Sequence, residues 1–429
     1  MKSVFGELGL WRIPTVYIIV SIVVGIVFPR IEAYYLPRLE NDVSVGSGLA
    51  FFGAVGSGMM ALTGIVFAVA FVVVQFSAAA YSPRLTLLLV ADPRLFHTLG
   101  IFMSTFIYSL IALLWTDRGA NGKVPEISAI IVMLLVAVSM LAFTRSIQLV
   151  NELEIHYVLK NIGRKGREAL ARLHAPLGHE KGELAGAPSN LSELLVGDAH
   201  EVRYSGESCV FAAMEREALV DLARRTDSVF VLERGIGDGV MPDELVARVY
   251  GSSAAVVESR MAKMIRLAPM RAMEGDPKYA IRLLVDIAIR ALSPAINDPT
   301  TAVESLDEIE GLIRRIGQLD LSIGHSRDET GKIRLIFPSP TWDDYLELAF
   351  SEIREYGDSS LQVMRRLRAA FIGIADSLAD EERRDAVLQQ LKHLDAVVAD
   401  SQFDAEDRRL ARDLDRQGIG LTRTVQRSS

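Results

Sequence analysis

The sequence has no charged side chain over a long stretch near its amino terminus. Although 23% of the 429 residues are charged, no Asp, Glu, Lys or Arg occurs from Val43 to Pro83. A bilayer core about 30 Å thick takes roughly 20 helical residues, so this run exceeds one simple crossing. We interpret it as a Gly-rich lead-in, residues 46–58, followed by a spanning helix over residues 59–80. A single long tilted helix with small residues on a packing face is the alternative. Either way, the sequence predicts a membrane protein.

Cysteine and the common catalytic motifs are also lacking. The single cysteine, Cys209, excludes a disulfide within the chain. The chain has no phosphate-binding loop ending in Gly-Lys-Ser/Thr, no His-Glu-x-x-His and no Gly-x-Ser-x-Gly. Its seven histidines are scattered, and only His174 and His179 are close in sequence. We therefore expect no metal site, no cofactor and no enzymatic activity.

Three further apolar stretches have the length of a membrane crossing, at residues 13–29, 98–116 and 127–144. The first has no small-residue cleavage pattern after it, so we expect it to be retained as a signal anchor. Together with residues 59–80, these stretches predict four spans within residues 1–150.

Basic residues are distributed unevenly between the two sides of such a four-span domain. Because Lys and Arg near span ends are retained in the cytoplasm, the richer side predicts cytoplasmic termini. That side would hold Lys2, Arg12, Arg84, Arg94, Arg145, Lys160, Arg164, Lys165, Arg167 and Arg172, whereas the other would hold Arg30, Arg38, Arg118 and Lys123. Residues 151–429 carry a net charge of minus ten, compared with minus eight for the whole chain. An acidic soluble part without a basic stripe argues against nucleic acid as a partner.

The sequence pattern of the soluble part predicts an α+β region. Helical spacing continues after the fourth span, so we expect the membrane helix to extend to about Leu173, within a helical extension and linker over residues 151–199. Short strand patterns around a Gly-Asp turn then predict a small barrel-sandwich-like β module over residues 200–252. A helical domain is expected over residues 253–414 and a disordered tail over residues 415–429.

A polar corner within this helical domain is the most specific segment. Asp286 is spaced to bridge Arg282 and Arg290 on one helix face. Asp276-Pro277, Ser293-Pro294 and Asp298-Pro299 each have a capping side chain before proline, which predicts helix starts. Helix capping explains most of the pattern; a functional lining is the second interpretation, formed by Asp286, Arg290, Ser293, Asn297 and Asp298.

A second group of candidates lies at the cytoplasmic end of the long apolar run. Polar groups at depth in a membrane seek a partner helix or water, and the candidates for a pore lining are Thr63, Gln75, Ser77 and Ser82. A short interfacial helix is expected over residues 83–90. Arg84 and Arg94 either hold lipid phosphates or serve only as topology determinants.

These segments also carry a resemblance. The motifs that carry it are Thr63 to Phe67, Gln75-Phe76, Ser82 to Leu85, Leu99 to Phe102 with Thr105, Phe106 and Tyr108, and Arg290 to Pro299 with Thr301-Ala302. In these motifs the sequence resembles a family of predicted bacterial membrane proteins known only as a domain of unknown function, over roughly Trp11 to Phe371. The resemblance implies a multi-span amino-terminal half and a soluble carboxy-terminal half, with no established activity. We expect the protein to lie in a bacterial inner membrane.

Three functional hypotheses follow. The leading one is a homo-oligomeric inner-membrane channel or transport-like protein, whose second span lines the path and whose cytoplasmic domain gates or assembles it, for an ion or small ligand. The alternative is a membrane-anchored scaffold or sensor that binds a cytoplasmic partner or small ligand without catalysis. The third, a lipid-modifying enzyme, would depend on Asp286 or Asp298.

Overall fold

The computed structural model describes residues 11–35, 44–80, 93–116, 124–151, 154–174, 195, 199–251, 254–273 and 275–420. The chain divides into two compact units, Met1–Glu154 and Ile155–Ser429. This division agrees with the predicted separation of a membrane half from a soluble half.

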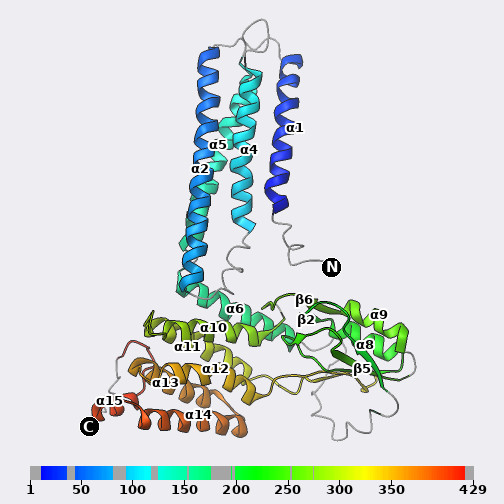
Figure 1. Ribbon diagram of the computed structural model, residues 1–429, viewed down its shortest axis with the longest axis vertical. Helices are drawn as coiled ribbons and strands as arrows, with labels where there is room; N and C mark the ends of the chain where they lie inside the picture. The colour runs from blue at the N-terminus through cyan, green and yellow to red at the C-terminus, as the bar shows by residue number, and fades with distance from the viewer. Residues whose placement is uncertain are drawn as a thin grey trace. The chain divides into compact units, whose positions relative to one another are not determined.

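Four long helices form the first unit (Figure 1): α1 Arg12–Tyr35, α2 Val45–Ala80, α4 Pro93–Trp115 and α5 Glu126–Asn151. All four are long and apolar enough to cross a membrane, with candidate spans Arg12–Glu32, Val45–Ala68, Pro93–Trp115 and Glu126–Ser146. The predicted number of spans is therefore confirmed.

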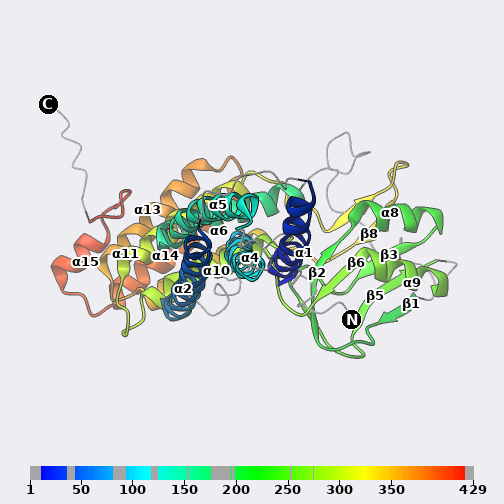
Figure 2. The same ribbon diagram turned by 90° about the horizontal axis from the view of Figure 1, so that it is seen from above.

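Helix α4 lies at the centre of this unit, between α1 and α2, and it also packs against α5 (Figure 2). A glycine permits the close approach of α1. A Cβ atom at Gly100 would lie 2.7 Å from Tyr17 Cδ2 and 3.3 Å from Pro14 Cα. Small residues at a helix crossing let the two backbones approach closely. Such packing holds helices together in lipid, where the hydrophobic effect does not drive their association.

The expectation of a separate lead-in before Met59 is wrong. Helix α2 is continuous from Val45 to Ala80, and its candidate span ends at Ala68 rather than at Ala80. Gly48 and Gly56 are both buried. A Cβ atom added at Gly48 would lie only 2.8 Å from Val124 Cγ2. The glycines thus serve helix packing, as the alternative interpretation held.

Helix α5 does not continue to Leu173 as expected. It ends at Asn151, and a separate amphipathic helix, α6, runs from Ile155 to Leu173 in the second unit. The buried face of α6 includes Gly163 and Gly166, and it packs against helices α10 and α11. The continuous helical spacing of apolar residues in the sequence does not mark where one helix ends and the next begins.

The β region contains two sheets. Strands β1 Ala199–Arg203, β5 Leu245–Tyr250, β3 Val229–Leu232, β8 Ile333–Ile336 and β7 His325–Arg327 form one sheet in that order; β4 Gly239–Val240, β2 Cys209–Met214 and β6 Ile265–Ala268 form the other. Among the strands that the structure describes, β3 and β8 are the one parallel pair. Helices α8 Arg216–Arg225 and α9 Ala254–Met264 accompany the sheets, and Phe211, Phe230 and Leu335 are fully buried in the shared core.

The predicted α+β character and the strands of the module are confirmed, but its extent is wrong. The strands expected over residues 200–252 are present, yet β6, β7 and β8 come from residues 265–336, which were assigned to the helical domain. The two sheets do not close into a barrel. The parallel β3–β8 pairing joins segments about a hundred residues apart, and local patterns carry no information about such pairing.

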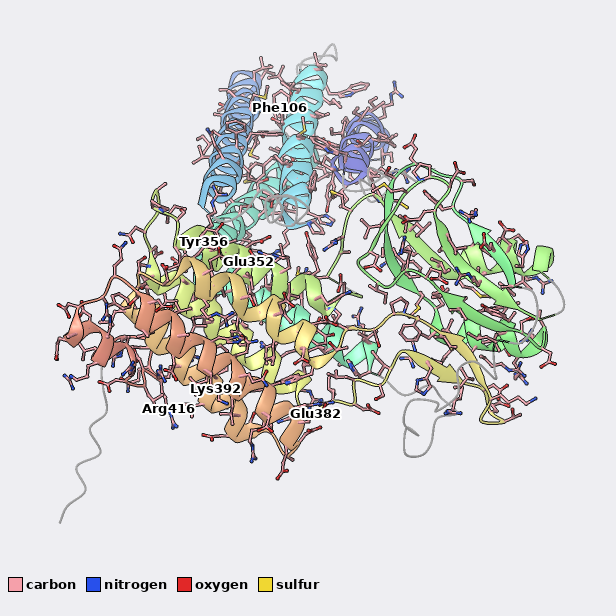
Figure 3. The ribbon with its side chains drawn as sticks, turned by 60° about the horizontal axis from the view of Figure 1, so that its bottom comes forward. Phe106, Glu352, Tyr356, Glu382, Lys392 and Arg416 are labelled. Carbon is pink, nitrogen blue, oxygen red and sulfur yellow. The ribbon has the colours of Figure 1, made fainter. Side chains whose placement is uncertain are left out.

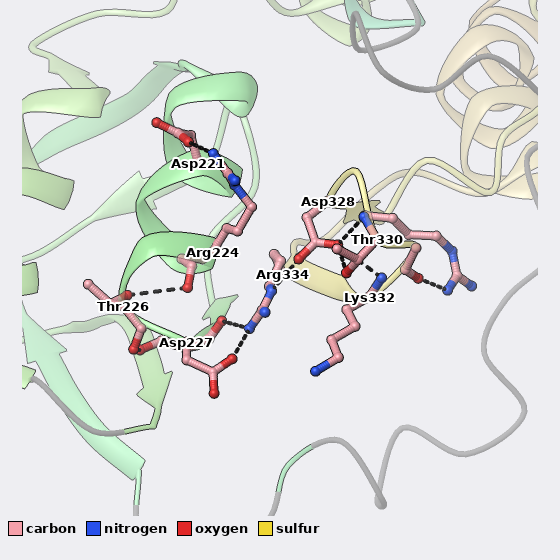
Figure 4. A network of polar contacts seen from close by, with 12 residues as sticks. Asp221, Arg224, Thr226, Asp227, Asp328, Thr330, Lys332 and Arg334 are labelled. Atoms are coloured by element: carbon pink, nitrogen blue, oxygen red, sulfur yellow. Dashed lines mark hydrogen bonds and ion pairs between the residues drawn. The ribbon is translucent and has the colours of Figure 1, made fainter.

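A buried ion pair fixes the β7–β8 hairpin (Figure 4). The Asp328 side chain is 1% exposed and accepts hydrogen bonds from Arg334 Nε at 2.7 Å and from Thr330 and Lys332 amides. Arg334 also donates to Asp227 at 3.0 Å. Burial would raise the pKa of Asp328, but the bonds from Arg334, Thr330 and Lys332 outweigh it and hold the pKa well below its usual range.

The remaining helices form a layered domain in which α6 and α12 cover α10, and α13 lies between α11 and α14. Their bounds are α10 Pro277–Ala291, α11 Pro299–Ile316, α12 Trp342–Tyr356, α13 Leu361–Ser377, α14 Glu381–Asp400 and α15 Ala405–Ala411. Two predicted caps are confirmed: Asp276 accepts from Lys278 N, and Asp298 accepts from Thr301 N. Figure 3 draws the side chains of this layer, with Glu352, Glu382, Lys392 and Arg416 labelled.

No helix begins at Ser293-Pro294, contrary to prediction. These residues form a turn after α10, in which Ser293 Oγ donates to the Arg290 carbonyl at 2.7 Å. Asn297 has a φ of 50°, and Asp298 N donates to the Ala291 carbonyl at 2.7 Å. The Ser293 carbonyl accepts from Ile296 N at 3.0 Å and from Asn297 N at 2.9 Å, so a single helical turn forms. The chain then reverses into α11, and this turn does not extend into a helix.

The expected disordered tail is also partly wrong. Asp415 is fully buried and accepts backbone N–H bonds from Gln417, Gly418 and Gly420 at 2.6–3.1 Å. Arg365 and Gln362 of α13 donate to the carbonyls of Gly420 and Gly418. Residues 415–420 therefore form a packed turn, while residues 421–429 lie outside the described part of the chain.

Candidate functional site

Helix α2 presents two different faces. One face is buried in the unit and includes Phe52, Gly56, Met59, Thr63 and Val66. The opposite face is exposed and includes a row of small residues, each of which except the last lies two residues, or about 200°, before one of the buried positions. The larger exposed side chains Ile65 and Val72 lie beside this row. We call it the α2 stripe: Ala50, Ala54, Ser57, Ala61, Gly64 and Ala68.

Of the four predicted pore-lining residues, the structure describes the side chains of Thr63 and Gln75, which lie on different faces of α2. Thr63 is 8% exposed, and its hydroxyl donates to the Met59 carbonyl at 2.7 Å within its own helix. Gln75 is exposed and lies seven residues after Ala68, so it continues the α2 stripe. Ser77 belongs to α2, but its side chain, together with Ser82, Arg84 and the helix expected over residues 83–90, lies outside the described residues. Arg94 is exposed in the first turn of α4.

The sequence reasoning missed a set of hydroxyl groups that join the membrane helices. Ser109 Oγ donates to the Phe52 carbonyl at 2.6 Å, linking α4 to α2, and Ser21 Oγ donates to the Ser104 carbonyl at 2.7 Å, linking α1 to α4. Thr105 and Ser139 link α4 to α5 through their hydroxyls at 3.1 Å. The signal was the spacing of Ser and Thr along α4. These groups are satisfied between helices of one chain and stabilise their packing.

In the second unit the predicted corner is the connection between α10 and α11. Asp286 accepts from Arg282 Nε at 2.6 Å, and Arg282 also pairs with Glu352 of α12, with Nη2 2.9 Å from Oε2. Asp298 accepts from Thr301 Oγ1 at 2.6 Å besides capping α11. Thus Arg282 links α10 to α12, and Ser293 and Asp298 form hydrogen bonds within the connection itself.

A pocket of about 640 Å³ lies elsewhere in this unit, between α11, α13 and the C-terminal turn. It is lined by Asp307, Glu310, Gly311, Arg314, Arg366, Ala369, Gly373, Asp376, Ser377 and Arg416. Its lining mixes guanidinium and carboxylate groups with the small residues Gly311, Ala369, Gly373 and Ser377. In the described part of the chain, no group of three or more His, Cys, Asp and Glu side chains could hold a metal ion.

A family model described as "Predicted membrane protein (DUF2254)" matches residues 8–372. The chain belongs to this family. The family match covers the four membrane helices, the β region and the helices up to most of α13, whereas Asp376 and Arg416 of the pocket lie beyond it.

Two mycobacterial proteins are distant relatives of this chain. Uncharacterized proteins of Mycobacterium bovis and Mycobacterium tuberculosis are 22% identical to this chain over 395 residues, which is 89% of this chain and 75% of each relative. No solved structure gives a significant match. The resemblance to a family of predicted membrane proteins is thereby confirmed.

Proposed function

We propose that this DUF2254 member is a homo-oligomeric channel or transport-like protein of the inner membrane, in which α2 forms the subunit interface and the soluble unit gates or assembles the complex. The α2 stripe is the observation that carries the proposal. Lipid tails are as apolar as leucine, so helices associate in membranes where small residues let backbones approach closely. An exposed stripe of small residues over about five turns of a spanning helix suits a second copy of α2 better than lipid.

The packing inside one chain supports the need for several copies. The hydroxyls buried among α1, α2, α4 and α5 are bonded to neighbouring helices or to their own helix, as for Ser21, Thr63 and Ser109. A water-filled path needs polar groups that face it. We therefore place the path between subunits, with both termini in the cytoplasm as the distribution of basic residues predicts.

Enlarging the stripe is expected to dissociate the complex. The Ala61→Leu variant adds three carbon atoms where backbones would be closest, so association should weaken at least about tenfold. Native mass spectrometry of full-length protein in nanodiscs measures the result, with three or more chains expected for the unmodified protein. Ala137→Leu makes the same change at an exposed position of α5 and should leave the oligomer intact. A monomeric unmodified protein would refute the proposal.

Conduction is tested separately by flux into liposomes. Because Gln75 continues the α2 stripe towards its cytoplasmic end, the Gln75→Leu variant should lose or alter flux while keeping the oligomer mass. Met60→Leu, an exposed apolar change off the stripe, is the control. Unchanged flux through Gln75→Leu would favour the second candidate function.

That second candidate is a membrane-anchored sensor or scaffold, and the pocket between α11 and α13 favours it. A volume of about 640 Å³ is in the range of small-molecule sites. Neither candidate assigns catalysis to the chain.

A further inference from the structure

The floor of the pocket is a chain of ion pairs between α11 and α13. The Arg366 side chain is 7% exposed, and its guanidinium lies 2.6 Å from Asp307 Oδ1 and 2.5 Å from Glu310 Oε2. The other Glu310 oxygen lies 2.5 Å from Arg314 Nη2. Burial would lower the pKa of Arg366, but the Glu310 and Asp307 carboxylates raise it, so the guanidinium stays positively charged. Two arginines and two acids leave this floor neutral.

Two further charges stand at the rim without partners. Arg416 and Asp376 both line the pocket and are exposed, and neither forms a hydrogen bond or an ion pair with any residue that the structure describes. They are therefore more than 4 Å apart, as no ion pair joins them. The rim offers one positive and one negative group at separate positions.

The position of Arg416 at the rim is fixed, because this residue belongs to the packed turn of residues 415–420. Asp415 is fully buried, and Arg365 donates to the Gly420 carbonyl at 2.9 Å, so the backbone beside Arg416 is fixed to α13. On the opposite wall Gly373 leaves room for Arg314, because a Cβ atom at this position would collide with the Arg314 guanidinium. Arg314 in turn has an Nε that is buried without a hydrogen-bond partner among the described residues.

We propose that this pocket binds a small zwitterionic molecule, with its anionic phosphate or carboxylate on Arg416 and Arg314 and its ammonium group on Asp376. Guanidinium groups bind such oxyanions with paired N–H donors, and a carboxylate accepts from an ammonium. A neutral floor between opposite rim charges favours a molecule that carries both charges over a simple anion or cation. The inference deepens the sensor function proposed above and does not depend on how α2 associates.

Titration calorimetry on the full-length protein tests the proposal, in nanodiscs of phosphatidylglycerol so that no zwitterionic headgroup is present. The probes are glycerophosphoethanolamine, the dipeptide alanylalanine, inorganic phosphate and ethanolamine. At least one of the first two should saturate the protein and should bind at least about tenfold more tightly than phosphate or ethanolamine. Binding of glycerophosphoethanolamine would identify a lipid headgroup as the source, and binding of the dipeptide would identify a soluble molecule.

Variants of the two rim residues locate the binding. Arg416→Gln and Asp376→Asn should each weaken the binding at least about tenfold, and both should fold normally because the side chains are exposed. Arg412→Gln, an exposed arginine nearby that does not line the pocket, is the control and should bind as the unmodified protein does. The proposal is overturned if neither zwitterion saturates at about 10 mM, if phosphate alone binds as tightly, or if the rim variants bind normally. Oligomer mass, measured on the same samples, separates this outcome from a failure of the α2 interface.

Discussion

Asp328→Ala is expected to lower the free energy of unfolding of the β region by about 3–5 kcal/mol, because it leaves a buried arginine without its carboxylate. The Arg334 side chain is 9% exposed, and the other carboxylate that it pairs with, Asp227, is 81% exposed. The amides of Thr330 and Lys332 would also lose their acceptor. Hydrogen exchange of the β7 and β8 amides, with denaturant unfolding of the full-length protein, measures the loss.

A surface pair in the same view provides the control for this substitution (Figure 4). Asp221 pairs with Arg224 and Arg225 on α8, but its side chain is 38% exposed. Exposed pairs contribute about 0–1 kcal/mol, so Asp221→Ala should change stability little. Equal effects of Asp221→Ala and Asp328→Ala would contradict the role given to burial.

The same carboxylate predicts a pH dependence. Its folded-state pKa lies below the ordinary value of 3.8, so the ionised group stabilises the fold above about pH 4 and this contribution is lost as the pH falls through the folded-state pKa. The unmodified protein should have a higher free energy of unfolding than Asp328→Asn. This difference should stay constant from neutral pH down to about pH 5 and disappear in stronger acid. A difference in the free energy of unfolding that grows on acidification would contradict this prediction.

Arg366→Met should lower the free energy of unfolding of the helical domain by about 3 kcal/mol. This is the lower end of the range for a broken buried ion pair, because Glu310 keeps its ion pair with Arg314. Methionine retains much of the apolar stem, so the change isolates the loss of charge. Differential scanning calorimetry measures it. The exposed Arg164, paired with Glu168 on α6, provides the control as Arg164→Met.

A double variant sharpens this second prediction. Arg366→Met with Glu310→Leu removes the buried acid as well, so part of the lost stability should return, since buried pairs are often replaceable by apolar groups. Additive losses would mean that the ion pair is not what destabilises the single variant. Residues that share a network are expected to be non-additive.

The sequence predicted features that depend on neighbouring residues. Four uncharged runs of sufficient length specify four membrane helices, since a backbone in lipid must bond to itself. Asp276-Pro277 and Asp298-Pro299 specify helix starts because the cap and the fixed φ act within one turn. Ser293-Pro294 has the same local signal, but the tight reversal between α10 and α11 overrides it.

Features that join distant segments required the tertiary structure. The sequence by itself determined a membrane half, a soluble α+β half and the family, because length, apolarity and local motifs are short-range properties. Only the fold decided which face of α2 is exposed, since that depends on where α4 packs. It likewise brought Arg416 to Arg314 and Asp376, which are separated by up to a hundred residues. The physical reason is that each such contact is fixed by packing between elements, whose relative placement no local pattern encodes.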